Sequence, residues 1–360
     1  MIHHVYTALG FLTLALAMAL WVIMTLEMKH FVPPSLEEGS TLAKVFARPP
    51  APSYKYIYVF HISNSRDWAQ GVAQNAVLKE LGPYVFRMET TRNLNWSGEI
   101  LFFQEQTSFY FEVNMSKGAL NDTFTTVNLP AMLSSNSKKS KKSSNKSIFL
   151  TTTIEKYFFT GSEDISEQGQ WKLATQNQTF AWFANVNASY GEKYMVHTKS
   201  GFVNRIIAVN NNTILAGYTS VCSDITGKIA GFGLLPAFTL SPDTVTIYEP
   251  RLCVPWTLGL QEQYNFGYEP IARFYGGRSL FNATSKICKS NWQTNTNGTF
   301  DASPYYSPDT SRKLPVVLSY PHFLYGEPAL HTQIDNLKPS EKKHSFYIDV
   351  HAPSGLVVDM

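Results

Sequence analysis

The feature that most constrains this chain is an uncharged apolar run near its start, residues 5–26, which contains no Lys, Arg, Asp or Glu. As an α-helix it would be about 33 Å long, enough to cross the hydrocarbon core of a bilayer. The alternative is a cleaved signal peptide. The run is long for one, however, and no Ala-x-Ala-like cleavage site precedes Glu27. The run therefore predicts a retained transmembrane helix.

The rest of the chain is rich in Asn-x-Ser/Thr triplets, the acceptor pattern for N-linked glycans, and none has Pro in the middle position. Their number predicts that the chain after the apolar run passes through the secretory lumen. We expect a cytoplasmic tail over residues 1–4, a transmembrane helix over 5–26 and an ectodomain over 27–360. The predicted glycosylation sites are Asn95, Asn114, Asn121, Asn145, Asn177, Asn187, Asn211, Asn282 and Asn297.

The ectodomain is long enough to bury a large core, and its composition favours β structure. The chain has 24 Phe and 19 Tyr, and only 16% of its residues are charged. The expected fold is α+β and mainly β, an antiparallel arrangement with short helices. Alternating segments predict strands over 54–60, 244–248, 316–320 and 346–350, a turn into a strand over 81–87, and helices over 67–79 and 152–159. Hairpins are expected around 104–108 and around Asn210–Asn212.

The formal net charge is +3, and it depends on one lysine-rich segment within the low-complexity stretch Ser134–Ser147. Without this segment the balance would be negative, so the composition gives no case for nucleic-acid binding. Two interpretations stay open: a solvated loop, or a cationic patch that binds anionic ligands or membrane surfaces. The candidate ligand-binding residues are Lys138, Lys139, Lys141, Lys142 and Lys146.

Two places in the sequence carry potentially reactive side chains, and we expect a structural role at both. Asp349 and His351 share a predicted strand face with His344 nearby, and we expect a solvated face rather than a metal or acid–base site. His322 lies among apolar residues and is expected to be a core histidine bonded to backbone. No hydrolase, metalloprotease or phosphate-loop motif is present, so we expect no enzyme activity, no cofactor and no metal.

Several segments share their order and spacing with one family. They are Glu37–Ser40, Pro49–Tyr54, Ile57–Asn64, Leu81–Arg87, Pro315–Tyr325, Asn336–Pro339 and Tyr347–Asp349. Together they resemble the class B scavenger receptors, which include the fatty-acid translocase, the lysosomal integral membrane receptor and the insect sensory neuron membrane proteins. The resemblance covers nearly the whole chain, from Leu36 to Val358.

The resemblance implies a β-barrel-like ectodomain with a small helical cap, anchored by helices at both chain ends and crossed by an apolar tunnel. It implies fatty acids, sterols, anionic phospholipids or lipoproteins as ligands. This sequence departs from the pattern in two ways. The last part of the ectodomain and the second transmembrane helix are missing, which predicts a fragment or a truncated product, and the cap segment after Pro130 is short and lysine-rich.

The chain has three cysteines, an odd count that leaves one unpaired or paired between chains in an oxidising compartment. The family resemblance implies a disulfide between Cys222 and Cys288 and leaves Cys253 without its usual partner.

The function expected is that of a membrane-anchored scavenger-type receptor that binds lipids or lipoproteins and assists lipid transfer, in the plasma membrane or the lysosomal membrane. The alternative is a lysosomal membrane receptor that traffics a soluble hydrolase, with a lumenal protein as its partner. An ecto-hydrolase is the least favoured class.

Overall fold

The computed structural model of the chain describes residues 35–128, 147–161, 175–176, 179–183, 190–215, 218, 220–238, 242–278, 280–281, 296–303 and 316–360. Ser35–Met360 forms a compact unit of its own. In this described part of the chain, no helix is long and apolar enough to cross a membrane. The apolar run over 5–26 and the five candidate lysines lie outside the described residues, so the predictions made for them stay predictions.

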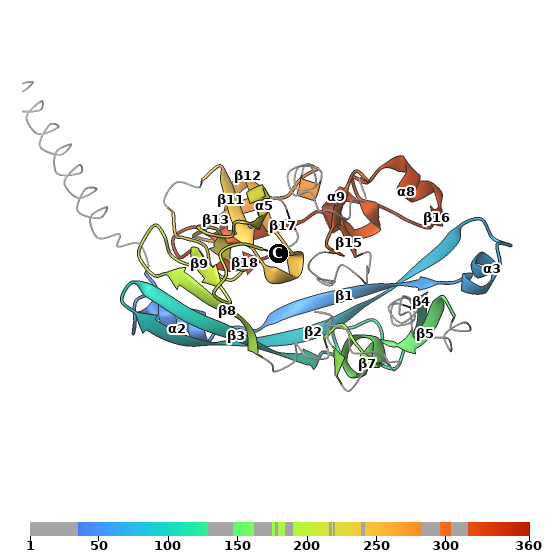
Figure 1. The fold of residues 1–360 in the computed structure, drawn as a ribbon, viewed down its shortest axis with the longest axis horizontal. Helices are drawn as coiled ribbons and strands as arrows, with labels where there is room; N and C mark the ends of the chain where they lie inside the picture. Colours follow the sequence, from blue (N-terminus) through green and yellow to red (C-terminus); the bar gives the residue numbers. More distant parts are fainter. Residues whose placement is uncertain are drawn as a thin grey trace, which may run out of the picture. The chain divides into compact units, whose positions relative to one another are not determined.

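The first sheet is built on a long hairpin. Its strands β2 (Ala76–Ser97) and β3 (Ile100–Phe111) pair antiparallel along their length. Gly98 has φ +60 in the two-residue turn between them, at the position where a type II′ turn favours glycine. β1 (Ser53–Ile62) pairs with the other side of β2, and Figure 1 shows the three strands side by side.

Shorter strands complete this sheet. β8 (Tyr190–His197) pairs with β3 and is followed by β9 (Ile206–Val209). β16 (Ile334–Asp335) pairs in parallel with the start of β2, so the C-terminal part of the chain is bound to its N-terminal part.

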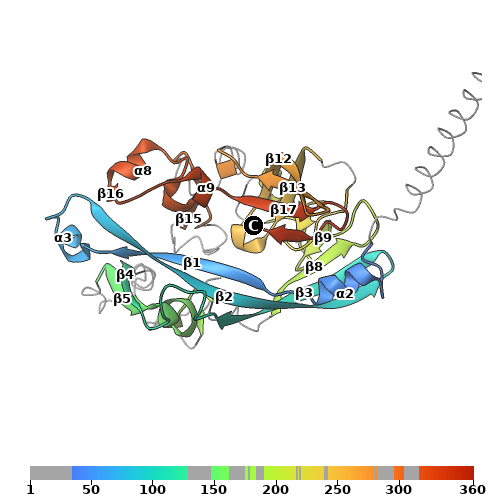
Figure 2. The ribbon, with the colours of Figure 1, turned by 180° about the vertical axis from the view of Figure 1, so that it is seen from behind.

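The second sheet has the strand order β10-β11-β12-β13-β17-β18. These strands span Ile229–Ala230, Thr244–Tyr248, Pro255–Phe266, Glu269–Tyr275, Tyr347–His351 and Val357–Asp359. All pairs are antiparallel except β10 with β11. Figure 2 shows β12, β13 and β17 from behind, in neighbouring positions. Within the described residues both sheets are open, because β1 and β9 end the main path of the first and β10 and β18 end the second.

The remaining elements are short. Three two-stranded sheets are formed by β4 (Thr123–Val127) with β5 (Phe149–Thr153), β6 (Thr175–Gln176) with β7 (Thr179–Phe180), and β14 (Thr299–Asp301) with β15 (Val317–Ser319). The helices of the described residues are α2 (Thr41–Ala47), α3 (Ser65–Ala69), α5 (Ser220–Ser223), α8 (Pro328–Thr332), α9 (Glu341–His344), the π-helix η1 (Lys156–Thr160), and the 3-10 helices η2 (Pro250–Leu252) and η3 (Pro321–Phe323).

Buried apolar side chains form three clusters. The second sheet supplies most of one continuous cluster, which includes Trp256, Phe274 and Ile348. The first sheet contributes to two others. The α2 cluster comprises Leu36, Phe46, Leu101, Phe103, Tyr194, Val196, Val203, Ile206, Val209, Ile225, Ala230, Leu234 and Tyr248. The aromatic cluster comprises Val59, Tyr84, Phe86, Phe109, Phe124, Ile154, Tyr157 and Phe158, with Phe159, Trp182 and Phe183 packed against it.

The prediction of a mainly β fold with short helices is confirmed, and so are the strands predicted over 54–60, 244–248, 316–320 and 346–350, each within about two residues. The strand predicted over 346–350 continues into a C-terminal hairpin of β17 and β18, with β18 at the sheet edge. The asparagine turn is also present: Asn210 and Asn211 have φ of 50 and 62, and Val209 N donates to Asn212 O. The prediction that the chain after this turn pairs along β9 is wrong, because Ile214 bridges to Asp224 instead.

Four further local predictions are wrong in whole or in part. The hairpin expected around 104–108 is one continuous strand, β3, because its polar side chains find partners on β2. The helix expected over 67–79 ends at Ala69, since the residues from Ala76 onward pair with β1 and β16. The helix expected over 152–159 is confirmed from residue 154 onward, where two α-helical residues continue as the π-helix η1, whereas Thr152 and Thr153 belong to β5. The turn expected at 81–87 lies inside β2, where a register shift between Ile57 and Val59 accommodates Gly82.

Candidate functional site

The two strands that flank the lysine-rich segment in the sequence, β4 and β5, pair with each other. β4 and β5 pair from Thr123↔Thr153 to Val127↔Phe149, so the strand ends that flank the segment are held side by side. Asn128 is buried and closes the pair, with its backbone N–H donating to Ile148 O at 2.8 Å and its Nδ2 to Ser147 O at 3.1 Å. The β4–β5 pair therefore fixes both ends of the segment, although its lysines lie outside the described residues.

A polar cavity of about 280 Å³ lies at this strand pair. Its lining is formed by Ser65, Arg66, Ala69, Gln70, Thr125, Ser147, Phe149 and Thr151. The helix α3 is attached to the pair through the rings of Trp68 and Phe149, whose centroids are 5.5 Å apart. Arg66 is the one charged residue of this lining, so the cavity has a positive wall beside the base of the lysine-rich segment.

Sequence reasoning missed Arg66 as a candidate, because it lies far from the lysines in the sequence and no local pattern marks it. Lys55 was also missed. Its Nζ lies 5.5 Å from the ring centroid of Phe109 and 5.2 Å from that of Phe183, within range of cation–π attraction. The fold places these two cations, Arg66 through the contact of α3 with β5 and Lys55 through the packing of β1 on the aromatic cluster.

The aromatic cluster is buried behind this region. Phe158 stacks on Phe183 with centroids 5.6 Å apart, and Phe124 meets Tyr157 edge to face at 5.1 Å. Tyr84 donates its hydroxyl to Asp122 Oδ2 at 3.1 Å, and burial together with this carboxylate raises its pKa to about 12. Such ring packing has the character of a closed core.

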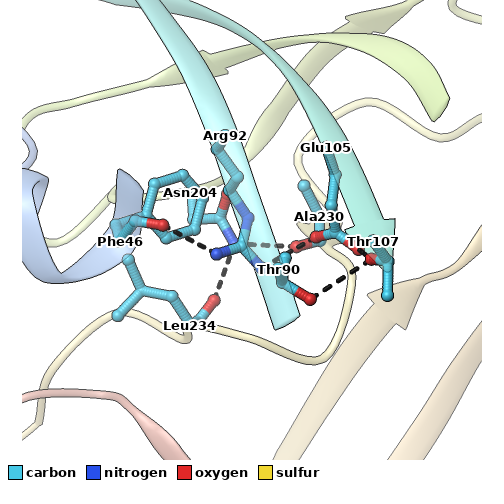
Figure 3. Close-up of polar contacts among 8 residues, drawn as sticks. All are labelled: Phe46, Thr90, Arg92, Glu105, Thr107, Asn204, Ala230 and Leu234. Atoms are coloured by element: carbon cyan, nitrogen blue, oxygen red, sulfur yellow. Dashed lines mark hydrogen bonds and ion pairs between the residues drawn. The ribbon is translucent and has the colours of Figure 1, made fainter. Parts of the chain in front are cut away.

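The face of the first sheet that carries both clusters has a polar band midway along it. Thr90 Oγ1 and Thr107 Oγ1 are 3.2 Å apart, and Arg92 Nη2 donates to Glu105 Oε2 at 2.8 Å (Figure 3). Cross-strand register places these pairs opposite one another, Thr90 with Thr107 and Arg92 with Glu105. We call these four residues the polar band.

Arg92 also ties the polar band to helix α2. Its Nη1 donates to Phe46 O at 2.7 Å, near the helix C-terminus, and its guanidinium lies 4.4 Å from the centroid of the Phe46 ring (Figure 3). A cation at this end of a helix is favoured by the helix dipole. The Arg92 side chain is 10% exposed and that of Glu105 is 32% exposed, so solvent reaches the band.

Nearby, Asn204 is fully buried and bridges two backbone carbonyls. Its Nδ2 donates to Ala230 O at 2.8 Å and to Leu234 O at 2.7 Å (Figure 3). Asn204 has φ +59, a left-handed conformation that asparagine tolerates. These bonds join the turn before β9 to β10 and to the segment that follows it, which makes Asn204 a structural residue.

The expectation of a solvated strand face at Asp349 is wrong. The Asp349 side chain is 2% exposed, and Arg273 clamps its two oxygens through Nε at 2.7 Å and Nη2 at 2.6 Å. Tyr264 Oη donates to the same carboxylate at 2.8 Å. The hydrogen bonds that Arg273 donates to Asp349 raise the pKa of Arg273, and burial followed by the hydrogen bond donated to Asp349 raises the pKa of Tyr264. The register of β13 and β17 sets Arg273 directly opposite Asp349 and so brings the two side chains together.

Hydrogen bonds also fix the side chains of His351 and His322. His351 contacts Glu269 through Nε2 at 2.7 Å and Ser354 through Nδ1 at 2.7 Å. His322 is buried as predicted, and its Nδ1 accepts from the backbone N–H of Lys338 at 3.1 Å. That bond leaves Nε2 to donate to Glu80 at 2.5 Å, a carboxylate contact that the sequence did not predict.

His344 is stacked on His322 rather than placed beside Asp349. The ring centroids are 4.4 Å apart and the planes differ by 19°. Burial, followed by the neighbouring His322, lowers the pKa of His344. In the described part of the chain, no group of three or more His, Cys, Asp or Glu side chains is arranged to hold a metal ion.

Two of the cysteines and five of the sequon asparagines lie in the described residues. Cys222 is disulfide-bonded and Cys253 is a buried thiol. Cys288 lies outside the described residues, so the Cys222–Cys288 pairing stays a prediction. Five sequon asparagines are described and all five are exposed: Asn95, Asn114, Asn121, Asn211 and Asn297. Asn145, Asn177, Asn187 and Asn282 lie outside the described residues.

Comparison with known proteins agrees with the sequence resemblance. The chain is 25% identical over 386 residues to Scavenger receptor class B member 1 of Bos taurus, covering 98% of this chain and 73% of the relative. It is 23% identical to Protein peste of Drosophila melanogaster, covering 84% and 58%. It is 20% identical to Lysosome membrane protein 2 of Mus musculus, covering 90% and 70%.

A family model described as the CD36 family matches residues 5–360. This match confirms the resemblance to class B scavenger receptors that the seven segments predicted. Because it spans nearly the whole length, the chain belongs to the CD36 family.

Proposed function

We propose that this chain is a membrane-anchored receptor of the scavenger type, which binds lipids or lipoproteins and assists lipid transfer through an apolar tunnel. The observation that carries the proposal is the family match over residues 5–360. Relatives named as scavenger receptors support a binding role rather than a catalytic one. The bonds of Asp349 to Arg273 and Tyr264 also argue against a role for this carboxylate in acid–base chemistry.

The proposed topology is a tail over residues 1–4, a transmembrane helix over 5–26 and an ectodomain over 27–360. The uncharged apolar run supports the anchor. The exposure of all five described sequon asparagines supports passage through the secretory lumen, since a glycan can be attached only to an accessible side chain. The plasma membrane and the lysosomal membrane are the two locations consistent with this topology.

The proposed ligand contact is the lysine-rich segment together with the polar cavity at its base. Lys138, Lys139, Lys141, Lys142 and Lys146 carry five positive charges between strand ends that are held side by side. Arg66 adds a positive charge at the cavity wall. Such a group attracts carboxylates and phospholipid headgroups in a salt-dependent way.

A second candidate function is that of a lysosomal membrane receptor that carries a soluble hydrolase. It is favoured by the likeness to Lysosome membrane protein 2 over 90% of this chain. Location of the native protein separates the candidates, because only the second requires most of it to reside in lysosomes.

The test is a ligand panel against the full chain in phosphatidylcholine nanodiscs. Labelled oleate, cholesterol, phosphatidylserine vesicles and native lipoprotein are offered, with empty nanodiscs as the background. We expect saturable binding of at least one ligand above that background. A folded chain that binds none of the four would contradict the proposed function.

A further inference from the structure

One predicted glycosylation site lies on the face of the first sheet that is opposite the two apolar clusters. We call this face the outer face. On β2, the residues before and after Asn95 pack against the α2 cluster, so Asn95 points to the outer face. On β3, both neighbours of Phe102 belong to the same cluster, so Phe102 points to the outer face as well.

Asn95 and Phe102 are direct partners in the register of β2 and β3. The Cβ atoms of residues directly opposite each other on antiparallel strands are about 5 Å apart. Asn95 is exposed, and Phe102 is 39% exposed although both of its neighbours are buried. A sugar attached to Nδ2 of Asn95 therefore reaches the Phe102 ring without leaving the outer face.

The apolar surface that begins at Phe102 continues on the next strand. Met195 of β8 lies opposite Phe102 in the register and is half-buried. Beside this row, Asn93 Nδ2 donates to Tyr190 Oη at 3.0 Å. The outer face thus carries a short apolar row next to Asn95, flanked by amide and hydroxyl groups.

The position of Asn95 differs from that of the other described sequon asparagines. Asn95 lies within a strand, whereas Asn114, Asn121, Asn211 and Asn297 lie in turns. A side chain in a strand has neighbours on the flanking strands, and a side chain in an exposed turn has few. Among the described sites, Asn95 is therefore the one at which the sheet itself offers a surface to the glycan.

The chemical group that fits this surface is N-acetylglucosamine, the first sugar of an N-linked glycan. One face of its ring carries C–H groups, which are attracted to the negative face of an aromatic ring. A sugar ring is about as wide as the strand spacing of about 4.8 Å, so a second sugar reaches the neighbouring strand. We propose that the glycan on Asn95 lies along the outer face, with its first N-acetylglucosamine stacked on Phe102 and its second over Met195.

This inference rests on the proposed function for one point, the passage of the ectodomain through the secretory lumen. It goes beyond that function because it makes the glycan a packed part of the first sheet. Sugar then covers the outer face around Phe102 and closes this surface to lipids and to protein partners.

The test is digestion of the folded, glycosylated full chain by a peptide N-glycosidase in phosphatidylcholine nanodiscs, followed by glycopeptide mass spectrometry. The rate of glycan release at Asn95 is divided by the rate at Asn114, a turn site in the same molecule. Each sample therefore carries its own reference, and a small change in the ratio of the two rates can be measured.

Phe102→Ala should raise this ratio roughly twofold, the scale of one weak C–H contact with a ring. Phe102→Leu should raise it as much, because leucine keeps apolar bulk but has no ring. Phe102→Trp keeps a ring and should leave the ratio at the wild-type value or below it. The matched control Phe266→Ala removes a phenylalanine of the second sheet that is 77% exposed, and it should keep the wild-type ratio.

An unchanged ratio in Phe102→Ala would overturn the proposal. A wild-type ratio in Phe102→Leu would also overturn it, because apolar bulk alone would then explain the protection. A chain that carries a glycan at Asn114 but none at Asn95 would overturn it while leaving the proposed function standing. Absence of glycan from every predicted sequon would contradict the proposed topology as well, so the two failures are distinguishable.

Discussion

The two sheets of this protein differ in how their inner faces are filled. The second sheet supports one continuous apolar cluster, and the buried carboxylate of Asp349 is satisfied within the sheet by the partly exposed Arg273. The first sheet carries two apolar clusters with the polar band between them. In that band the Glu105 side chain is 32% exposed, compared with 2% for Asp349.

This difference suggests that the second sheet mainly stabilises the fold, whereas the first sheet carries the proposed ligand contact. The ring-packed core of the second sheet and the Arg273–Asp349 pair serve to hold the fold. The first sheet has a solvated band, and the β4–β5 pair that brackets the lysine-rich segment is attached to its strand β1 through Thr125 N and His61 Nδ1, 2.9 Å apart. This difference between the sheets sets the order of the stability losses expected from the mutations below.

The largest effect is expected in the continuous cluster. Phe274 is fully buried on β13, and Phe274→Ala should lower the free energy of unfolding by about 4 kcal/mol through lost transfer energy and a residual cavity. Phe102→Ala, at a first-sheet position that is 39% exposed, is the matched control and should cost about 0.5 kcal/mol or less. Urea unfolding of both variants measures the two free energies, and equal losses of stability would contradict the difference between the two sheets.

The next effect is expected at the buried ion pair. Asp349→Ala leaves the Arg273 guanidinium without its bidentate partner and should cost about 3 kcal/mol. The control Glu262→Ala removes the exposed carboxylate 3.5 Å from the same arginine and should be close to neutral. Denaturation midpoints report both values, and a near-neutral Asp349→Ala would show that the pair does not hold the sheet.

A smaller effect is expected in the polar band. Glu105→Gln keeps the shape but removes the charge opposite Arg92, while the bond from Arg92 to Phe46 O remains. The expected cost is about 1 kcal/mol, since the carboxylate is partly solvated. Thermal unfolding at low and high salt checks it, and a loss as large as that of Asp349→Ala would contradict a solvated band.

The smallest effect is expected with pH. Because burial lowers the pKa of His344, the unfolded chain binds this proton more tightly than the folded chain does. The stability that the neutral ring contributes is present above the ordinary histidine pKa of about 6.5 and is lost as the pH falls through the lowered pKa. Melting temperatures between pH 8 and pH 5 should fall less steeply for His344→Gln than for wild type. His331→Gln, which leaves the stacked pair intact, should keep the wild-type slope.

The strands that sequence reasoning predicted well are those whose side chains alternate between one buried and one solvated face, such as Tyr54–Phe60 in β1. Within β3, Glu105 and Thr107 broke the alternation and suggested a turn, because their partners Arg92 and Thr90 lie on another strand. The polar band is thus a property of strand register. Its two pairs of residues lie on different strands, so no short segment of the sequence contains both members of a pair.

The candidate site was predictable only in part. The lysines are visible as a composition bias, but the cavity at their base depends on α3 meeting β5 through Trp68 and Phe149. Asp349 was assigned to a solvated face because the local sequence does not show that Arg273 lies directly opposite. In both cases the missing information is the pairing of distant segments.

The central claim is that this chain receives anionic lipid at the lysine-rich segment and the cavity beneath it. The most direct measurement is binding of phosphatidylserine vesicles to the full chain in phosphatidylcholine nanodiscs, at 20 mM and 300 mM salt. Replacing Lys138, Lys139, Lys141, Lys142 and Lys146 by Gln should weaken binding and flatten its salt dependence, and Arg66→Gln should weaken it further. Asp349→Asn is the control for indirect effects on the fold. Wild-type binding and wild-type salt dependence in the lysine variant would contradict the account.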